Sequence, residues 1–115
     1  MVTSSYVPDR GHLVWVSFDP SMGREQAGRR PALVLSPAVY NGRVSLALAC
    51  PITLRRKGYP FEVLLPAGLP IAGAILADHV KSLDWEARQA SFAGVVPDSV
   101  LAAVRQRLGP LLGFP

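Results

Sequence analysis

Hydrophobic residues in this chain occur in short blocks that prolines, glycines and polar residues separate. Residues 12–18 (HLVWVSF) are rich in valine and aromatic residues and predict a first strand. Residues 31–36 (PALVLS) predict a second strand, and residues 43–50 (RVSLALAC) predict a third. Asn41-Gly42 is a strong signal for a tight turn between the last two. These two strands are therefore expected to form an antiparallel hairpin.

The second half of the chain changes from a strand pattern to a helical one. Further short strands are predicted at residues 61–65, 74–77, 80–83 and 91–96. From residue 98 onward, apolar residues recur every three or four positions, which predicts a helix. Asp98 or Ser99 is expected to cap the start of this helix, and Gly109-Pro110 is expected to bend or end it.

These elements predict a mainly β fold with a C-terminal helix. The 115 residues amount to about one domain, and no repeat or linker divides residues 1–115. The 11 prolines and 10 glycines supply the turns that many short strands require. We expect one small, strongly bent sheet or barrel.

Composition narrows the class of protein. Half of the residues are hydrophobic, which is not the composition of a disordered chain. The net charge of +4 fits a polyanionic partner such as nucleic acid, but charge that only maintains solubility explains it equally well. The longest apolar stretch, residues 44–54, is far shorter than the ~20 residues of a membrane span. The expectation is a soluble cytoplasmic protein without a membrane partner.

Cysteine and histidine are too few for the usual metal and redox sites. Cys50, the single cysteine, lies in an apolar run and is expected in the core, and no internal disulfide is possible. His12 and His79 do not match the spacing of a zinc site. Phosphate-loop, dinucleotide and nucleophile-elbow motifs are also absent. We therefore expect no cofactor and no metal.

Positive charge is concentrated in two loops. The first loop, residues 21–30, and the second, residues 53–59, supply Arg24, Arg29, Arg30, Arg55, Arg56 and Lys57, which we call the basic edge. If the second and third strands pair in antiparallel fashion, Arg30 lies close to Thr53. Such an edge suits a phosphate chain.

Aromatic residues near this edge offer stacking surfaces for bases. Tyr59, between Gly58 and Pro60, is expected to be partly exposed, and Tyr40 is another candidate. Trp15 is a third candidate, but its place in an apolar strand favours the core.

The basic edge also contains residue types that can cleave RNA. RNA supplies its own nucleophile, the 2′-OH, so the protein needs a proton acceptor and cations that stabilise the phosphorane. An arginine fork matches two phosphate oxygens, and a threonine hydroxyl can donate to a third. Glu25 is a possible proton acceptor, although an ion pair with Arg24 or Arg29 is at least as consistent with the composition.

Three segments, YVPDRGHLVWVSFDPSMGREQAGRRPALVLSP, CPITLRRKGYPFEV and ILADHVKSLDW, resemble the MazF/PemK family of toxin endoribonucleases. The resemblance covers about residues 6–85 and implies a homodimeric SH3-like barrel. It implies metal-independent cleavage of single-stranded RNA at short sequences, leaving a 2′,3′-cyclic phosphate and a 5′-hydroxyl. It also implies a MazE-like antitoxin, through which alone operator DNA is bound.

The resemblance assigns roles residue by residue. The family's catalytic arginine and threonine fall on Arg30 and Thr53, and its glutamate-glutamine pair falls on Glu25 and Gln26. Asp78 falls where some members place a base, although it can instead orient Arg30 or a turn. His79 replaces a usual glutamine, and Arg29 stands where a histidine can occur. RNA binding is expected of Arg24, Gln26, Arg29, Arg55, Arg56, Lys57, Tyr59, Asp78 and His79.

Two other functions remain open from the sequence. A gyrase poison of the CcdB-like class has the same barrel but needs no arginine–threonine pair. A non-catalytic RNA-binding module would show salt-dependent binding without cleavage.

Overall fold

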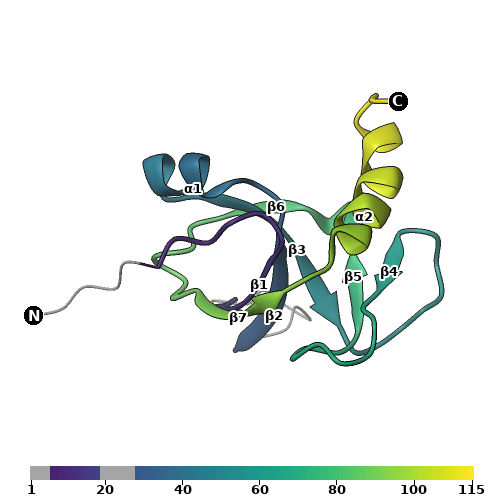
Figure 1. Ribbon diagram of the computed structural model, residues 1–115, viewed down its shortest axis with the longest axis horizontal. Coiled ribbons are helices and arrows are strands. Elements are labelled where there is room, and N and C mark those ends of the chain that lie inside the picture. Colours follow the sequence, from purple (N-terminus) through teal and green to yellow (C-terminus); the bar gives the residue numbers. More distant parts are fainter. Residues whose placement is uncertain (1–5, 19–27) are drawn as a thin grey trace, which may run out of the picture.

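The computed structural model describes residues 6–18 and 28–115. Along these residues the chain forms, in order, β1 (His12–Ser17), β2 (Arg29–Val34), α1 (Ala38–Val44), β3 (Ala47–Thr53), β4 (Glu62–Leu64), β5 (Ala74–Leu76), the short 3₁₀ helix η1 (Ala77–His79), β6 (Lys81–Leu83), β7 (Ser91–Val95) and α2 (Asp98–Leu111) (Figure 1). The predicted mainly β fold with a C-terminal helix is confirmed.

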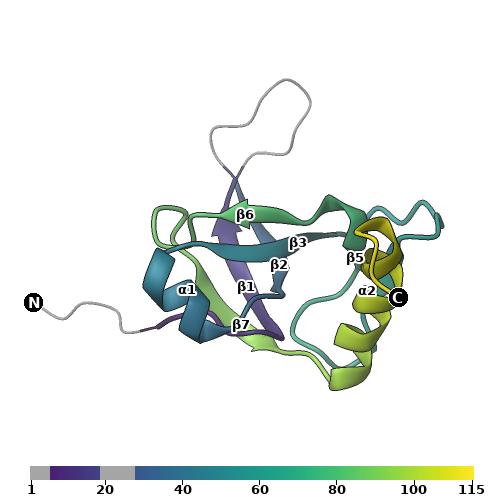
Figure 2. The ribbon, with the colours of Figure 1, turned by 90° about the horizontal axis from the view of Figure 1, so that it is seen from above.

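Every strand pair in the described sheet is antiparallel. The strands follow the order β4-β5-β3-β2-β1-β7, and β6 also pairs with β3. The first half of β3 pairs with β6 and its second half with β5, so β3 carries the bend of the sheet. Figure 2 shows α1 and α2 at opposite ends of this bent sheet.

Two hydrophobic clusters lie on the two faces of the central strands. Leu13 and Leu33 point to the cluster that includes Val104 of α2, whereas Val14 and Val34 point to the other cluster. Adjacent residues of one strand thus contribute to different clusters, as the alternation of a β-strand requires. The central strands are buried on both faces, which explains why they are apolar almost without interruption.

Residues 38–44 form helix α1, so the predicted tight turn at Asn41-Gly42 is wrong. The third strand begins at Ala47 and ends at Thr53, later than predicted. The cause is tertiary, because the fully buried Asn41 side chain donates hydrogen bonds to the carbonyl oxygens of Pro8 and Ser36. These bonds are available only in the folded chain, and they override the local turn preference.

Helix α2 differs from its prediction at both ends. Pro97 is the N-cap residue and no side chain caps the helix, so the expected caps at Asp98 and Ser99 are wrong. At the other end the helix continues through Pro110 to Leu111. A proline in the final turn disrupts few helical hydrogen bonds, and the Gly109 before it has no side chain to clash with the proline ring.

Cys50 lies in the core, as predicted. The residue is fully buried, and burial, with the nearby charge of Asp78, raises the thiol pKa to about 12. A thiol with this pKa is not a thiolate at neutral pH and is therefore a poor nucleophile. Within the residues that the structure describes, no helix is long and apolar enough to cross a membrane.

Candidate functional site

Pairing between β2 and β3 directs the two central residues of the candidate site to the same edge of the sheet. The antiparallel register joins Ala32 to Pro51 and Leu33 to Cys50. Continued by two residues, this register brings the backbone of Arg30 towards that of Thr53, at the point where β3 turns from β2 to pair with β5. The predicted proximity of these residues therefore agrees with the strand pairing, even though the connection between the strands contains a helix.

Two hollows lie on either side of the last residues of β3. One, of about 230 Å³, is lined by Trp15, Arg29, Arg30, Pro31, Ile52, Leu54, Pro70, Ile71 and Ala72. The other, of about 490 Å³, is lined by Thr53, Arg55, Lys57, Tyr59, Glu62, Leu76, Asp78 and His79. Alternate residues of β3 and the following loop face the two hollows, since Ile52 and Leu54 line the first with Arg30, whereas Thr53 and Arg55 line the second.

Local contacts fix the position of Thr53. Its hydroxyl oxygen accepts a hydrogen bond from the Arg55 amide at 3.0 Å, which leaves the hydroxyl hydrogen available to donate to a ligand. Gly73, the residue before β5, approaches Thr53 closely. A Cβ atom on Gly73 would lie 2.5 Å from the Thr53 carbonyl oxygen, so only glycine fits there.

Glu62 holds the second basic loop in shape. Its carboxylate accepts hydrogen bonds from the backbone amides of Lys57 at 2.8 Å and Gly58 at 2.9 Å. From α2, Arg107 donates to the carbonyl oxygen of Pro60 at 3.1 Å. Because the loop is held through its backbone, its basic side chains stay available on the surface.

Tyr59 and Asp78 form one unit in the larger hollow. The Tyr59 hydroxyl donates to the Asp78 carboxylate at 2.7 Å. Burial, this hydrogen bond and the charges of Asp78 and Glu62 raise the Tyr59 pKa to about 12, so the phenol stays protonated at neutral pH. His79 Nε2 lies 3.9 Å from the same carboxylate. Asp78 therefore orients Tyr59. Within the described part of the chain, it makes no hydrogen bond or ion pair with Arg30.

Arg29 is exposed, but its guanidinium is bound to other parts of the protein. Its guanidinium donates to Ser17 Oγ at 3.2 Å, the Trp15 carbonyl at 3.0 Å, the Gln89 carbonyl at 2.8 Å and Ser91 Oγ at 2.9 Å. These contacts fasten the start of β2 to the end of β1 and the start of β7. RNA binding by Arg29 stays a prediction, but these bonds give it a structural role next to Arg30.

The expectation that Trp15 belongs to the core is wrong. Its exposed fraction is 38%, whereas Val14 and Val16 on either side are buried. β1 is paired on both sides, and only this side chain reaches out of the two clusters into the smaller hollow. Polar and apolar residues do not alternate along this strand, so the sequence could not show that Trp15 is exposed.

The predicted sites at Arg24, Glu25 and Gln26 lie outside the described residues. Within the described part of the chain, no three His, Cys, Asp or Glu side chains are grouped so that they could hold a metal ion.

Sequence reasoning did not find the supporting residues Glu62 and Gly73. Glu62 lies five residues after Lys57, a spacing that matches no common turn motif. Gly73 follows a run of turn residues, and its close approach to Thr53 appears only once β5 is paired with β3.

Comparison with known proteins identifies the family. The sequence model of the PemK-like, MazF-like toxins of type II toxin-antitoxin systems matches residues 9–112. The chain belongs to this family. It is 48% identical over 112 residues to the endoribonuclease toxin MazF of Escherichia coli, a match that covers 97% of this chain and 100% of the relative. The endoribonuclease PemK of Escherichia coli is 31% identical over 109 residues, covering 90% of this chain and 81% of PemK.

Solved structures agree with this membership. The crystal structure of MazF from Deinococcus radiodurans superposes with a TM-score of 0.89 at 61% identity, covering 96% of this chain and 100% of that chain. A MazE-MazF crystal structure from the same organism gives a TM-score of 0.87 at 57% identity, with the same coverage. A MazF-like fold thus extends over nearly the whole chain.

Proposed function

We propose that this MazF-family chain, acting as one domain over residues 1–115, is a toxin that cleaves single-stranded RNA in the cytoplasm without a metal ion. The 2′-OH attacks the adjacent phosphorus, the bond to the 5′-oxygen breaks, and the products carry a 2′,3′-cyclic phosphate and a 5′-hydroxyl. The observation that supports the proposal is the antiparallel β2–β3 pairing, whose register, continued from Ala32 and Pro51, directs Arg30 and Thr53 to the same basic edge.

Arg30 has the geometry and charge to stabilise the phosphorane. Its guanidinium is a planar cation with five N–H donors, so its roles are to stabilise the developing charge and to donate a hydrogen bond to the leaving 5′-oxygen, which takes its proton from water. Thr53, whose hydroxyl oxygen accepts a hydrogen bond from the Arg55 amide, donates its hydroxyl hydrogen to a phosphate oxygen. Glu25, assigned by family resemblance, is proposed to accept the 2′-OH proton.

The remaining basic edge binds the RNA chain. Arg55, Arg56 and Lys57 have no side-chain hydrogen bond or ion pair with any residue that the structure describes, and they are exposed beside Thr53. Each exposed cation that meets a phosphate releases counterions and adds affinity. Arg24, Gln26 and His79 are proposed to contact the RNA near the cleaved bond.

The test is cleavage of a long single-stranded RNA in EDTA, with the 5′ ends mapped by primer extension. We expect discrete cuts at a recurring short sequence. Arg30→Ala should abolish them without altering the circular dichroism spectrum. The control is Arg43→Ala, which removes the same charge from an exposed position in α1.

Other outcomes would point to other functions. RNA binding without cuts by the wild-type protein would indicate a binding module. If the wild-type protein neither binds nor cleaves RNA but traps gyrase on cleaved DNA, it is a gyrase poison. Cleavage that survives Arg30→Ala would contradict the proposed site.

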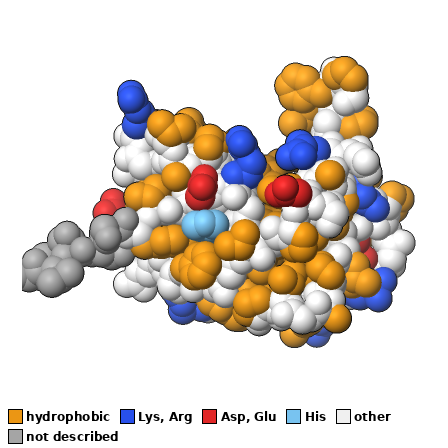
Figure 3. Space-filling model, in the orientation of Figure 1, with side chains coloured by type: hydrophobic (Ala, Val, Ile, Leu, Met, Phe, Trp, Pro, Cys, Tyr) orange, Lys and Arg blue, Asp and Glu red, His pale blue; other side chains and the backbone are white. Residues whose placement is uncertain are grey.

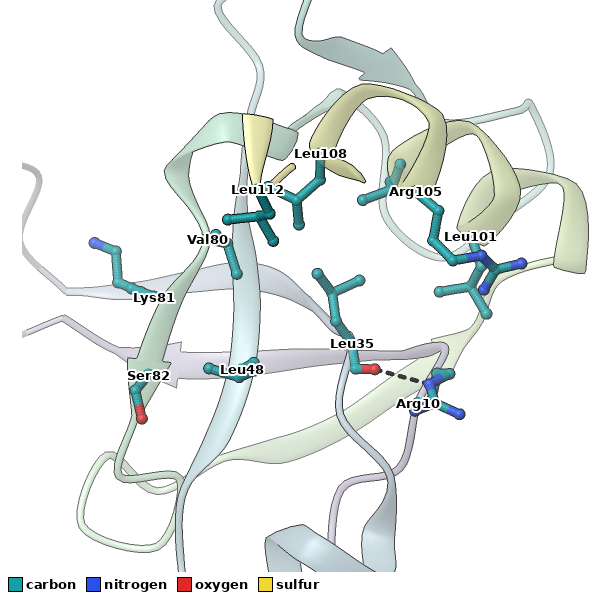
Figure 4. Close-up of a pocket in the computed structure, with 11 residues that line it drawn as sticks. Arg10, Leu35, Leu48, Val80, Lys81, Ser82, Leu101, Arg105, Leu108 and Leu112 are labelled. Atoms are coloured by element: carbon teal, nitrogen blue, oxygen red, sulfur yellow. Dashed lines mark hydrogen bonds between the residues drawn. The ribbon is translucent and has the colours of Figure 1, made fainter. Parts of the chain in front are cut away.

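A second surface supports the proposal of a homodimer. An apolar groove of about 700 Å³ runs between α2 and the sheet, where Leu35, Leu48 and Val80 face Leu101, Leu108 and Leu112 (Figure 4). Figure 3 shows a notch beside α2 with lysine and arginine side chains at its margin and apolar side chains over the helix end. The exposed fractions of Leu111, Leu112 and Phe114 are 54%, 59% and 64%. We propose that a second copy of the chain covers this groove.

Analytical ultracentrifugation tests the dimer. Leu48→Asp places a charge in the groove and should give a monomer. Leu64→Asp is the matched control, because Leu64 is 54% exposed on β4 and lies outside the groove, whereas Leu48 is 42% exposed within it. A dimer that persists in Leu48→Asp would place the interface elsewhere.

We also propose a MazE-like antitoxin partner, since relatives have been crystallised as MazE-MazF complexes. An acidic segment of such a partner would complement the basic edge and compete with RNA. Operator DNA is then contacted only by the antitoxin.

A further inference from the structure

Trp15 lines the smaller hollow, together with Arg30. Around it lie the apolar side chains of Pro31, Leu54 and Pro70, and Leu54 is 80% exposed. Large aromatic side chains on a doubly paired strand are ordinarily buried. An exposed one beside an open apolar hollow offers a flat surface to a flat ligand.

The wall that carries Trp15 is held rigidly. The Arg29 guanidinium hydrogen-bonds the Trp15 carbonyl oxygen and both Ser17 and Ser91 side chains. The backbone of Trp15 is also opposite Pro31 in the β1–β2 register. Rigid walls lower the entropy lost on binding, so this hollow is prepared for a ligand before the ligand arrives.

Size, polarity and position together define the ligand. A cavity of about 150 Å³ can hold a benzene ring, so the 230 Å³ hollow has room for a larger flat ring. Arg30 lines the same hollow and supplies a cation for a phosphate beside that ring. A ring joined to a phosphate by a short linker is a nucleotide.

We propose that this hollow is a subsite for one nucleobase of the RNA, the base next to the phosphate that Arg30 binds, with Trp15 as its stacking wall. The inference rests on the proposed RNA cleavage and adds a binding residue to it. The subsite is separate from the larger hollow, where the Tyr59 hydroxyl is already bonded to Asp78.

A double-mutant cycle between protein and RNA tests the subsite. The probe is an RNA oligonucleotide that carries the mapped cleavage sequence, with one 2′-deoxynucleotide at the cleaved position to prevent attack. A set of such probes replaces each base in turn by an abasic nucleotide. The dissociation constant of each probe is measured for wild-type protein, Trp15→Ala and Trp15→Phe.

Loss of one stacked base should weaken wild-type binding by about 5- to 150-fold at one probe position. Trp15→Ala should weaken binding of the intact probe to a similar extent. In this variant, the abasic nucleotide at the coupled position should cause no further loss of affinity, whereas abasic nucleotides at other positions should act as they do in wild type. Trp15→Phe should recover most of the affinity, because it keeps an aromatic face. Val39→Ala, which truncates a 67% exposed side chain in α1, should behave like wild type throughout.

The failures can be told apart. If the wild-type protein cleaves RNA but no probe position couples to Trp15, the base subsite is overturned and the proposed cleavage stands. If affinity falls equally for all probes in a Trp15→Ala protein with an unchanged melting temperature, Trp15 has no base-specific contact and the proposal also fails. If the wild-type protein does not cleave RNA, both proposals fall.

Discussion

Two polar regions at opposite ends of β3 use hydrogen-bonding groups in opposite ways. Near its start, Asn41 is fully buried and joined to Ser36, Pro8 and Trp85, and we call these four residues the Asn41 network. Near its end, the Arg30 and Arg56 side chains have no hydrogen bond or ion pair with any part of the chain that the structure describes. In the first region, the polar groups of Asn41 form hydrogen bonds with other protein atoms. In the second region, the guanidinium donors of Arg30 and Arg56 remain available to a ligand.

The difference predicts which property each region controls. Of the described residues, none has a buried side-chain nitrogen or oxygen without a hydrogen-bond partner. Removing a partner inside the Asn41 network therefore leaves buried polar groups unpaired and lowers stability. Removing Arg30, Arg55 or Arg56 from the basic edge breaks no hydrogen bond or ion pair with the described residues, so it should leave stability unchanged and act on RNA alone.

The largest effect is expected for Arg30→Lys. Lysine keeps the positive charge but loses the planar fork that can bind two phosphate oxygens. We expect kcat/KM for RNA cleavage to fall about 10²- to 10³-fold, the size seen when one transition-state donor is removed. The melting temperature should change little. Single-turnover cleavage measures the first quantity, and Arg43→Lys is the control; full activity in Arg30→Lys would mean that only the charge matters.

Asn41→Ala should reverse this pattern. It leaves the carbonyl oxygens of Pro8 and Ser36 and the Ser36 hydroxyl without their Asn41 partner. We expect the free energy of unfolding to fall by about 3 kcal/mol, from roughly 1 kcal/mol for each group. Cleavage per folded molecule should not change. Urea denaturation gives the stability, and Val39→Ala, at a 67% exposed position of the same helix, should cost under about 0.5 kcal/mol.

The contrast also explains what sequence reasoning could predict. Strand blocks rich in valine and leucine were located within a few residues, and the antiparallel pairing predicted between residues 31–36 and 43–50 is confirmed for β2 and β3. The proximity of Arg30 and Thr53 that follows from this pairing stays a prediction. The basic loop was visible because its charges are contiguous in sequence. Both results depend on local composition and one pairing.

Features that depend on distant residues were missed. The Asn41 side chain is held by Pro8, 33 residues away, and its helix replaced the predicted turn. Arg29 is held by Gln89 and Ser91, 60 and 62 residues away, so its structural role left no local pattern. Trp15 was misplaced because a strand buried on both faces shows no alternation from which an exposed position can be recognised.

A smaller effect is expected when two exposed arginines of the basic edge are neutralised. Arg55→Gln combined with Arg56→Gln should lower RNA affinity about tenfold, with no change in the melting temperature. The slope of log K against log salt should decrease by about 1.4, or roughly 0.7 for each phosphate contact on a single strand. Filter binding at several NaCl concentrations between about 50 and 200 mM measures the slope. An unchanged slope would show that neither arginine meets a phosphate.

The smallest effect concerns Asp9, at the exposed rim of the Asn41 network. Its carboxylate accepts hydrogen bonds from the backbone amides of Ala38, the first residue of α1, and Arg10, both at 2.8 Å. These two hydrogen bonds hold the Asp9 pKa below its ordinary value of 3.8, and the bond from Ala38 has the larger effect. A carboxylate whose pKa is lower in the folded state stabilises the fold above its unfolded pKa, and this contribution disappears as the pH falls through the folded pKa.

Asp9→Ala should therefore lower the free energy of unfolding at pH 7 by about 0.5–1 kcal/mol, a modest value because the carboxylate is solvent-exposed. The difference from wild type should shrink as the pH is lowered below 3.8, where the wild-type carboxylate becomes protonated and loses its advantage. Urea denaturation across this range measures both proteins. A difference that stays constant with pH would mean that the carboxylate charge is not the source of the stability, and that the rim of the Asn41 network is held by packing alone.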